Sequence, residues 1–183
     1  MDRDTKSPKE RFRRKCMERL KRIGRQSTFQ KDRAVLKRLQ QVIEEEGARS
    51  VMLYLPLGTE VDISPLIRYL RRHGITVYVP FMEGASFRLV KYRYPLRVKR
   101  FGIKEPNDSK QYRNRQIDIA VVPIVGMDAT YRRVGFGKGM YDRFFEKEIK
   151  NINRVIFVAR ALCYSKEIVT DRYDVKADMV IVP

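Results

Sequence analysis

The sequence predicts an α/β fold: a single three-layer domain over residues 1–183, with a mainly parallel central sheet and helices on both faces. A chain of 183 residues has the usual length of one domain, and 43% hydrophobic residues suffice for a sizeable core. Short apolar runs typical of buried strands alternate with segments of helical periodicity. Strands separated by helices need crossover connections, which give parallel strands covered on both faces. Residues 1–8 could be disordered.

Two basic amphipathic helices are predicted within residues 9–46. The first follows Ser7 and Pro8, which suit an N-cap and the first helical position. Its apolar residues recur every three or four positions, at Phe12, Cys16, Met17, Leu20 and Ile23. The second helix starts after Ser27-Thr28 and ends at Gly47, because glycine is common just after a helix end.

The rest of the chain alternates between strand and helix. Apolar runs predict strands over 50–55, 75–80, 87–92, 117–123, 155–159 and 179–182. Helical patterns predict helices over 61–72 and 140–149, and residues 93–116 are rich in loops. Because ligands of open α/β sheets bind at the carboxyl ends of the strands, the loops after the strands are the functional candidates. These loops are 56–62, 80–86, 124–141 and 159–165.

The charge is strongly basic, with 40 Lys and Arg against 22 Asp and Glu and a formal net charge of +18. Residues 1–40 contain 15 Lys and Arg against 5 Asp and Glu, so more than half of the excess lies in the first fifth of the chain. Such a balance suggests an anionic partner: nucleic acid, an anionic membrane surface, or a phosphorylated or carboxylated small molecule. A solvated helix face explains the same pattern, and composition alone does not decide among these.

Several kinds of site are excluded by residue counts. His73 is the only histidine and stands at the polar end of a predicted helix, which excludes a multi-histidine zinc site. Cys16 and Cys163 cannot build a four-cysteine metal site, and we expect reduced thiols with no disulfide partner. No apolar run approaches the roughly 18 residues of a membrane span, and the N-terminus lacks a signal peptide's apolar segment. We therefore expect a cytoplasmic protein with no membrane partner.

The segment 132–143, Arg-Arg-Val-Gly-Phe-Gly-Lys-Gly-Met-Tyr-Asp-Arg, is the strongest candidate for a ligand site. Alternate glycines let the backbone approach a ligand closely, and their N–H groups can converge on phosphate oxygens. Lys138 and the start of the following helix favour anions, and Asp142 could hold a Mg²⁺ ion that bridges phosphate oxygens. The spacing matches neither the P-loop nor the dinucleotide fingerprint, so a tight strand-to-helix turn explains it equally well.

The same segment resembles the R-L-G-x-G-x-G-Y-Y-D signature of the 5-formyltetrahydrofolate cyclo-ligase family (methenyltetrahydrofolate synthetases). Shorter motifs occur in the family's order, so the resemblance extends over about residues 9–180. They are K-x-x-x-R at Lys9–Arg13, Y-x-P-x-x-x-E-V-D at Tyr54–Asp62, G-I-x-E-P at Gly102–Pro106, I-D-[IL]-x-[VL]-x-P at Ile117–Pro123, and D-x-x-x-D at Asp174–Asp178. Each motif alone is weak, whereas the ordered set is specific.

The resemblance implies an ATP- and Mg²⁺-dependent enzyme. It would convert 5-formyltetrahydrofolate to 5,10-methenyltetrahydrofolate and release ADP and phosphate. Phosphorylation of the formyl oxygen makes it a good leaving group, and the N10 amine then closes the ring. Such chemistry needs positioning and charge neutralisation more than a nucleophilic side chain, which suits a sequence with one histidine. Both small-molecule substrates are anions, so we do not expect a nucleic-acid partner.

The resemblance also assigns roles to single residues. Lys9 and Arg13 would contact ATP phosphates, and the ATP site would continue through Arg133, Val134, Gly135, Phe136, Gly137, Lys138, Gly139, Met140 and Tyr141. The catalytic residues would be Lys138, Tyr141 and Arg133. The folate would contact Leu55, Glu60, Phe136, Met140 and Tyr141, and Mg²⁺ would be held by Asp142 and Asp174.

The sequence departs from the family pattern in three places. Met140 replaces one of two paired tyrosines, and Phe136 replaces another tyrosine in the glycine loop. Both replacements stay apolar, so we expect a changed pocket with activity retained. Residues 159–165 also lack the glutamine-containing loop of the family.

Some alternatives stay open at this point. Without the resemblance, Glu60 is an ordinary carboxylate at a helix entry, and Asp174 and Asp178 are turn and surface charges. Tyr54 could pack in the core or line a pocket. For the whole chain, the alternatives are a nucleic-acid-binding protein that uses the basic N-terminal helices, and a non-catalytic relative that binds folate or nucleotide.

Overall fold

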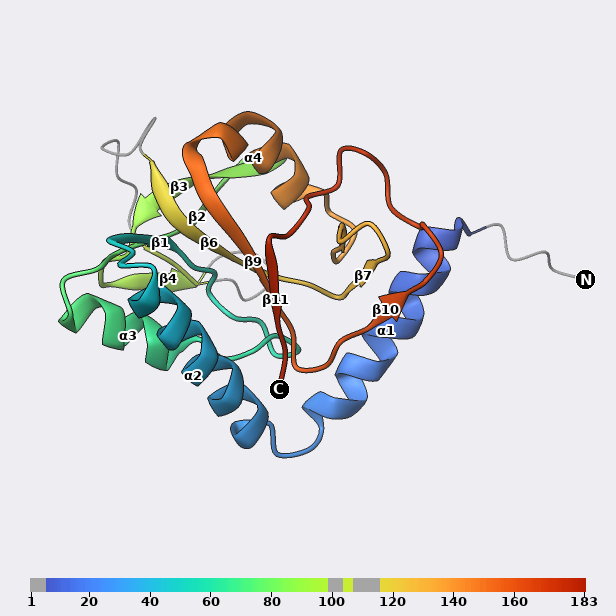
Figure 1. Cartoon of the computed structure of the whole chain (residues 1–183), viewed down its shortest axis with the longest axis horizontal. Helices are drawn as coiled ribbons and strands as arrows, with labels where there is room; N and C mark the ends of the chain where they lie inside the picture. The colour runs from blue at the N-terminus through green and yellow to red at the C-terminus, as the bar shows by residue number, and fades with distance from the viewer. Residues whose placement is uncertain (1–5, 99–103, 107–115) are drawn as a thin grey trace, which may run out of the picture.

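The computed structural model of the protein describes residues 6–98, 104–106 and 116–183. Its central sheet has six strands in the order β11-β9-β6-β1-β2-β3 (Figure 1). The first five run parallel, and the edge strand β3 is antiparallel to β2. The strands are β1 (Ser50–Met52), β2 (Thr76–Glu83), β3 (Ser86–Lys91), β6 (Ile117–Pro123), β9 (Ile152–Val158) and β11 (Met179–Ile181). This sheet confirms the predicted fold class.

Helices cover both faces of the sheet (Figure 1). α2 (Phe29–Glu45) and α3 (Ser64–Arg72) lie on one face, and α4 (Met140–Glu148) with the short 3₁₀ helix η2 (Ile149–Asn151) lies on the other. α1 (Pro8–Gly24) lies to the side, next to a small sheet of β10 (Tyr164–Ser165), β7 (Gly126–Asp128) and β8 (Arg133–Val134). β4 (Leu96–Val98) pairs with β5 (Lys104–Pro106). None of the helices within the described ranges is long and apolar enough to cross a bilayer.

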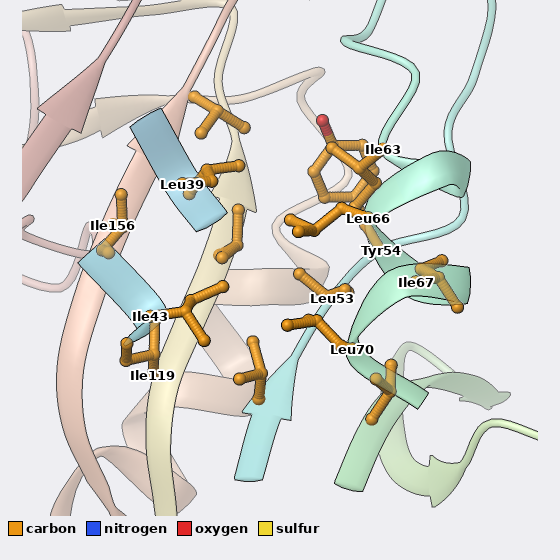
Figure 2. Close-up of a cluster of buried hydrophobic side chains, with 14 of the residues drawn as sticks. Leu39, Ile43, Leu53, Tyr54, Ile63, Leu66, Ile67, Leu70, Ile119 and Ile156 are labelled. Atoms are coloured by element: carbon orange, nitrogen blue, oxygen red, sulfur yellow. The ribbon is translucent and has the colours of Figure 1, made fainter. Parts of the chain in front are cut away.

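The larger hydrophobic core lies between the sheet and the pair α2–α3 (Figure 2). Leu39 and Ile43 project from α2 toward Ile119 of β6 and Ile156 of β9. These four side chains are completely buried. Full burial of one such side chain contributes roughly 1.5–3 kcal/mol, so this layer holds α2 firmly against the sheet.

Local sequence signals set the ends of the first two helices. Ser7 and Glu10 form a capping box at the start of α1, in which each residue's backbone N–H donates to the other's side chain. Gly47 follows α2 with a φ of +59°, the conformation that predicted a glycine there. Of the N-terminal residues 1–8, residues 1–5 lie outside the described residues, whereas Ser7 caps α1 and Pro8 begins it.

The connection between β1 and α3 differs from the prediction. After the Leu53 N–H donates to the Tyr78 carbonyl, the chain leaves the sheet, so β1 is shorter than the apolar run 50–55. α3 begins at Ser64 instead of residue 61, and the Ser64 N–H donates to Asp62 Oδ1. Val61 and Ile63 belong to an irregular segment, but both side chains are buried. Their spacing therefore resembled the apolar pattern of a helix. The carboxyl edge of the sheet therefore carries a long loop.

Cys16 and Cys163 form a disulfide, so the expectation of reduced thiols without a disulfide partner is wrong. The two cysteines are 147 residues apart, and their Cα atoms lie 5.7 Å from each other, within the normal range for a bridge. The expectation rested on the usual redox state of cytoplasmic proteins, which carries no information about proximity in the fold. Around the bridge, Leu20 of α1 packs on Val125 in a small separate core.

Breaking this disulfide is expected to lower the free energy of unfolding by about 2–4 kcal/mol, because the bridge closes a very long loop in the unfolded chain. Urea unfolding with and without a thiol reductant measures the difference. The double variant C16A/C163A serves as the control and should not respond to the reductant. Two free thiols in protein purified without reductant, counted by mass spectrometry after alkylation, would contradict the bridge.

Candidate active site

Two cavities meet at the glycine loop, residues 135–139, which connects β8 to α4. One has a volume of about 160 Å³ and mostly apolar walls, and the other has a volume of about 380 Å³ and charged walls. Arg133 and Gly139 line both. Both cavities draw on loops at the carboxyl edge of the sheet, where open α/β folds bind ligands.

The charged cavity is built from three segments. α1 contributes Lys9 and Arg13, which are four residues apart and therefore share one face of the helix. The glycine loop contributes Gly135, whose carbonyl oxygen accepts a 2.9 Å hydrogen bond from Arg13 Nε. Two acidic side chains near the C-terminus, Asp171 and Asp174, complete the wall. Backbone groups and cations thus converge on one space together with carboxylates, which include Asp142 of α4.

Arg133 is the most constrained of these cations. Its side chain is only 5% exposed, and its Nε is buried without a hydrogen-bond partner in the described part of the chain. Asp142 Oδ1 lies 3.6 Å from that nitrogen, and the guanidinium carbon lies 4.7 Å above the Tyr141 ring. Burial lowers the pKa of Arg133, although Asp142 opposes this shift. Such an unpaired donor carries an energetic penalty that a hydrogen bond would relieve.

The glycines of the loop leave room for the Arg133 guanidinium and allow the backbone conformation that leads into α4. A Cβ added at Gly135 would lie 2.1 Å from Arg133 Nη2, so no other residue fits there without moving the guanidinium. Gly137 and Gly139 have φ values of +96° and +62°, in the region that glycine adopts most easily. Gly139 immediately precedes α4, so the helix N-terminus also faces the charged cavity.

The apolar cavity lies at the ends of β1, β2 and β6. Leu55 follows β1, Met82 lies near the end of β2, and Pro123 ends β6. Phe87 of β3 closes one side and stacks edge-on with Tyr141 at 5.0 Å between ring centroids. Burial raises the pKa of Tyr141, so its hydroxyl stays protonated. The resulting slot suits a flat, mostly apolar ring system with a few polar atoms.

Glu60 is the carboxylate in the wall of this cavity. The Leu57 N–H donates a 2.8 Å hydrogen bond to Glu60 Oε2, which fixes the side chain across the loop. Burial raises the pKa of Glu60 from 4.5 to about 7, although the Leu57 hydrogen bond and the charges of Arg133 and Arg160 oppose the shift. Glu60 lies four residues before α3, so it does not act as a helix-entry carboxylate. Near neutral pH it can both accept and donate hydrogen bonds.

The acidic residues in the charged cavity fit a metal only in part. Lys9 Nζ is hydrogen-bonded to Asp174 and, at 3.1 Å, to Asp171. Burial alone would lower the pKa of Lys9, but these two hydrogen bonds raise it. No cluster of three or more metal-ligating side chains exists within residues 6–98, 104–106 and 116–183. Since Mg²⁺ is usually held by one or two carboxylates together with substrate phosphates, Asp142 and Asp174 fit a metal that arrives with a nucleotide.

The structure brings most of the predicted site residues together. The five residues predicted to contact folate all line the apolar cavity: Leu55, Glu60, Phe136, Met140 and Tyr141. Among the predicted ATP residues, the charged cavity is lined by Lys9, Arg13, Arg133, Gly135, Gly137 and Gly139. Both predicted metal ligands, Asp142 and Asp174, line it as well.

Other predicted residues lie elsewhere. The Val134 side chain is fully buried in β8 and lines neither cavity. Lys138 lies between Gly137 and Gly139, which line the charged cavity. Its own side chain lines the apolar cavity instead. Asp178 accepts a 2.8 Å hydrogen bond from the Val155 N–H and joins β9 to the final segment. Part of one motif, Gly102 and Ile103, lies outside the described residues.

The sequence analysis missed other residues at these cavities. Asp171 lies three residues before Asp174 and holds Lys9, a position that the D-x-x-x-D motif does not include. The wall of the apolar cavity also includes Leu57, Pro80 and Met82. A larger groove of about 550 Å³ lies between β3 and α4 and contains none of the predicted site residues. It reaches the amino ends of β6 and β9, opposite to the edge where such folds bind ligands.

Comparison with known proteins identifies the family. The sequence profile of the 5-formyltetrahydrofolate cyclo-ligase family matches residues 5–183. The chain belongs to this family. The match covers both cavities and all the segments that line them, which confirms the resemblance found in the motifs.

Individual members of the cyclo-ligase family are distant but cover most of the chain. The 5-formyltetrahydrofolate cyclo-ligase of Haemophilus influenzae is 27% identical over 157 residues, which are 80% of this chain and 82% of that protein. The enzyme of Escherichia coli K12 is 27% identical over 143 residues, 74% of this chain and 79% of that one.

Solved structures of the family have the same fold. The NMR structure of Aquifex aeolicus 5,10-methenyltetrahydrofolate synthetase superimposes with a TM-score of 0.75 at 28% identity, covering 95% of this chain and 88% of that one. The Mycoplasma pneumoniae synthetase, at 19% identity, gives a TM-score of 0.70 over 96% of this chain and 98% of that one, and supports the fold alone.

The raised pKa of Glu60 predicts a specific pH dependence of stability. The folded state holds the Glu60 proton more tightly than the unfolded state, whose pKa is near 4.5. The stability contribution is therefore complete below pH 4.5 and is lost as the pH rises toward 7. Replacing Glu60 by Gln should raise the free energy of unfolding at pH 8 by about 1–3 kcal/mol and leave it nearly unchanged at pH 4.5.

Urea unfolding at several pH values measures this difference. The matched control is Glu167→Gln, because Glu167 is an exposed carboxylate that lines neither cavity. Equal stabilisation by the Glu60 substitution at pH 4.5 and pH 8 would show that its carboxyl group titrates normally.

Proposed function

We propose that the protein converts 5-formyltetrahydrofolate to 5,10-methenyltetrahydrofolate with ATP as co-substrate and with ADP and phosphate as products. The observation that carries this proposal is the junction of a charged and an apolar cavity at Arg133 and Gly139. A reaction between a nucleotide phosphate and a flat ring system needs such a junction, because the two reacting groups have to meet at one point.

The charged cavity supports nucleotide binding. Lys9 and Arg13, the loop amides and the start of α4 supply positive charge and hydrogen-bond donors for phosphate oxygens. Asp171 and Asp174 form ion pairs with Lys9 and so hold its ammonium group in the wall of this cavity.

The apolar cavity supports pterin binding. Its hydrophobic walls contact a planar ring, and the Glu60 carboxylate accepts hydrogen bonds from the N–H donors of the pterin. Phe136 and Met140 contribute hydrophobic surface but no hydroxyl group. The folate is thus recognised on its faces by packing and on its edge by Glu60.

The proposed reaction has two steps. The formyl oxygen attacks the γ-phosphorus of ATP, the bond from that phosphorus to the bridging oxygen breaks, and the electron pair leaves with ADP. The product is an N5-iminium phosphate. The N10 amine then attacks the activated carbon, its proton is lost, and the carbon–oxygen bond breaks to release phosphate and leave the cyclic amidinium product.

Three side chains have roles in these steps. Arg133 lines both cavities, and its guanidinium would stabilise negative charge on the transferred phosphoryl group. Tyr141 supports the guanidinium from below with its ring and keeps its hydroxyl proton for hydrogen bonding. Lys138, in the wall of the apolar cavity, supplies a second cation on the folate side.

Mg²⁺, held by Asp142 and Asp174, would shield phosphate charge when it arrives with ATP. Lys9 Nζ is hydrogen-bonded to Asp174 Oδ2, so Asp174 would be shared between Lys9 and the metal.

We also propose that the enzyme acts in the cytoplasm, where ATP is available. A disulfide there has to resist thiol reductants. Cys16 and Cys163 are 0% and 6% exposed, and thiol exchange requires access to a sulfur atom. Their burial supports a bridge that survives in this compartment.

A direct assay tests the proposed reaction. Purified protein with ATP, Mg²⁺ and 5-formyltetrahydrofolate is expected to generate the absorbance of the methenyl product together with one ADP per turnover. Omission of ATP should abolish both signals. Folded protein that binds folate or nucleotide without turnover would instead indicate a non-catalytic relative. Salt-sensitive RNA or DNA binding without turnover would favour the nucleic-acid alternative.

Replacing Lys138 by Ala is expected to lower kcat/KM for the folate by about 10²-fold, the usual scale for one electrostatic group at the reacting centre. Lys147→Ala is the matched control, because Lys147 is an exposed lysine on α4 outside both cavities. Steady-state kinetics at saturating ATP measure the effect. Equal kinetics for the two variants would remove Lys138 from the catalytic residues.

A further inference from the structure

An ion pair between Arg160 and Asp32 lies behind the loop that carries Glu60. Arg160 Nε donates to Asp32 Oδ1 at 2.7 Å, and its Nη2 donates to Asp32 Oδ2 at 2.8 Å. Both residues are 6% exposed. Asp32 belongs to the first turn of α2, and Arg160 lies two residues after β9, so the pair joins two segments that are 128 positions apart.

The remaining hydrogen bonds of this pair go to the Glu60 loop. Arg160 Nη1 donates to the Gly58 carbonyl oxygen at 2.8 Å, and Asp32 Oδ2 accepts from the Asp62 N–H at 3.2 Å. These contacts flank Glu60 on both sides. The loop has no regular secondary structure, so it depends on such contacts for its conformation.

We propose that the Arg160–Asp32 pair positions the Glu60 loop, and thereby sets the affinity of the apolar cavity for the folate. This inference rests on the proposed function. Arg160 and Asp32 line neither cavity. They are positioning residues that act on the substrate through the loop backbone and the Glu60 carboxylate.

The geometry favours positioning over a contribution to stability. A buried ion pair often contributes little net stability, since desolvation offsets the attraction. Arg160 uses its planar fork on both carboxylate oxygens and still reaches Gly58, which a lysine ammonium cannot do at once. The charge of Arg160 also acts on Glu60. Burial raises the pKa of Glu60, and the charges of Arg133 and Arg160 both lower it. Tyr54 and Tyr141 also interact electrostatically with Glu60.

The decisive variant replaces both partners, D32L/R160M. Replacing a buried pair by apolar residues of similar size is often neutral for stability, whereas removing one partner leaves an unpaired charge. We therefore expect a folded double variant that has lost both anchors of the loop. R160K is the second variant. It keeps the charge but loses the fork, and it carries the test if the double variant does not fold.

The kinetic readout separates the two substrates. In D32L/R160M the KM for 5-formyltetrahydrofolate is expected to rise about tenfold while the KM for ATP changes less than twofold, and R160K should give a smaller rise for the folate alone. The matched control is E46L/R154M, because Arg154 and Glu46 form a more exposed ion pair that also joins β9 to the end of α2. The control should leave both KM values unchanged.

Hydrogen exchange tests the positioning without any substrate. The Leu57 and Glu60 N–H groups are both hydrogen-bonded within the loop, and their exchange is expected to accelerate at least about tenfold in D32L/R160M while exchange in β6 and β9 stays constant. Unchanged exchange in R160K and the double variant would overturn the inference. A wild-type protein without turnover would overturn the proposed function, yet accelerated loop exchange would still support positioning by the pair. Unchanged folate KM with accelerated exchange would confine the pair to a structural role and overturn its effect on affinity.

Discussion

The burial of the Arg133 guanidinium constrains the whole site. A buried donor without a partner costs about 1–3 kcal/mol, and Arg133 Nε is such a donor among the residues that the structure describes. The neighbouring residues reduce this cost only in part, since Asp142 lies 3.6 Å away and Tyr141 presents its ring. The need to keep space around the guanidinium requires a glycine at 135 and sets the loop that leads into α4. Arg133 lines both cavities, so this arrangement shapes a wall of each.

The loops around Arg133 are held by buried carboxylates and not by secondary structure. Asp32 holds the Glu60 loop through the Asp62 N–H. Asp128 accepts hydrogen bonds from the Val169 and Thr170 N–H groups and so fixes the segment leading to Asp171. Burial alone would raise the pKa of Asp128, but hydrogen bonds from Thr130 and Thr170 lower it to about 2. An ionised carboxylate can accept hydrogen bonds from several amides at once, and such charge-assisted bonds are stronger than neutral ones.

These anchors explain what the sequence could and could not predict. Periodicity and capping are local properties, so α1, α2 and β6 were predicted nearly to the residue. The glycine loop was found because its spacing is also local. Contacts between distant segments leave no such pattern. The Cys16–Cys163 bridge and the Arg160–Asp32 pair depend on where the fold places their backbones, and the side to which Lys138 points depends on the backbone angles of its glycine neighbours.

The basic residues of α1 differ in where the fold places them. Lys9, Arg13, Cys16 and Leu20 follow one another at spacings of three and four, so they lie along one face of α1. Cys16 and Leu20 attach this face to the small core at Val125, and the same rotation of the helix directs Lys9 and Arg13 into the charged cavity. Other cations of α1, such as Lys15 and Arg22, are exposed. Most of the positive charge of α1 therefore lies on its solvated side, whereas the proposed phosphate site uses two residues, of which Arg13 is hydrogen-bonded to the glycine loop at Gly135.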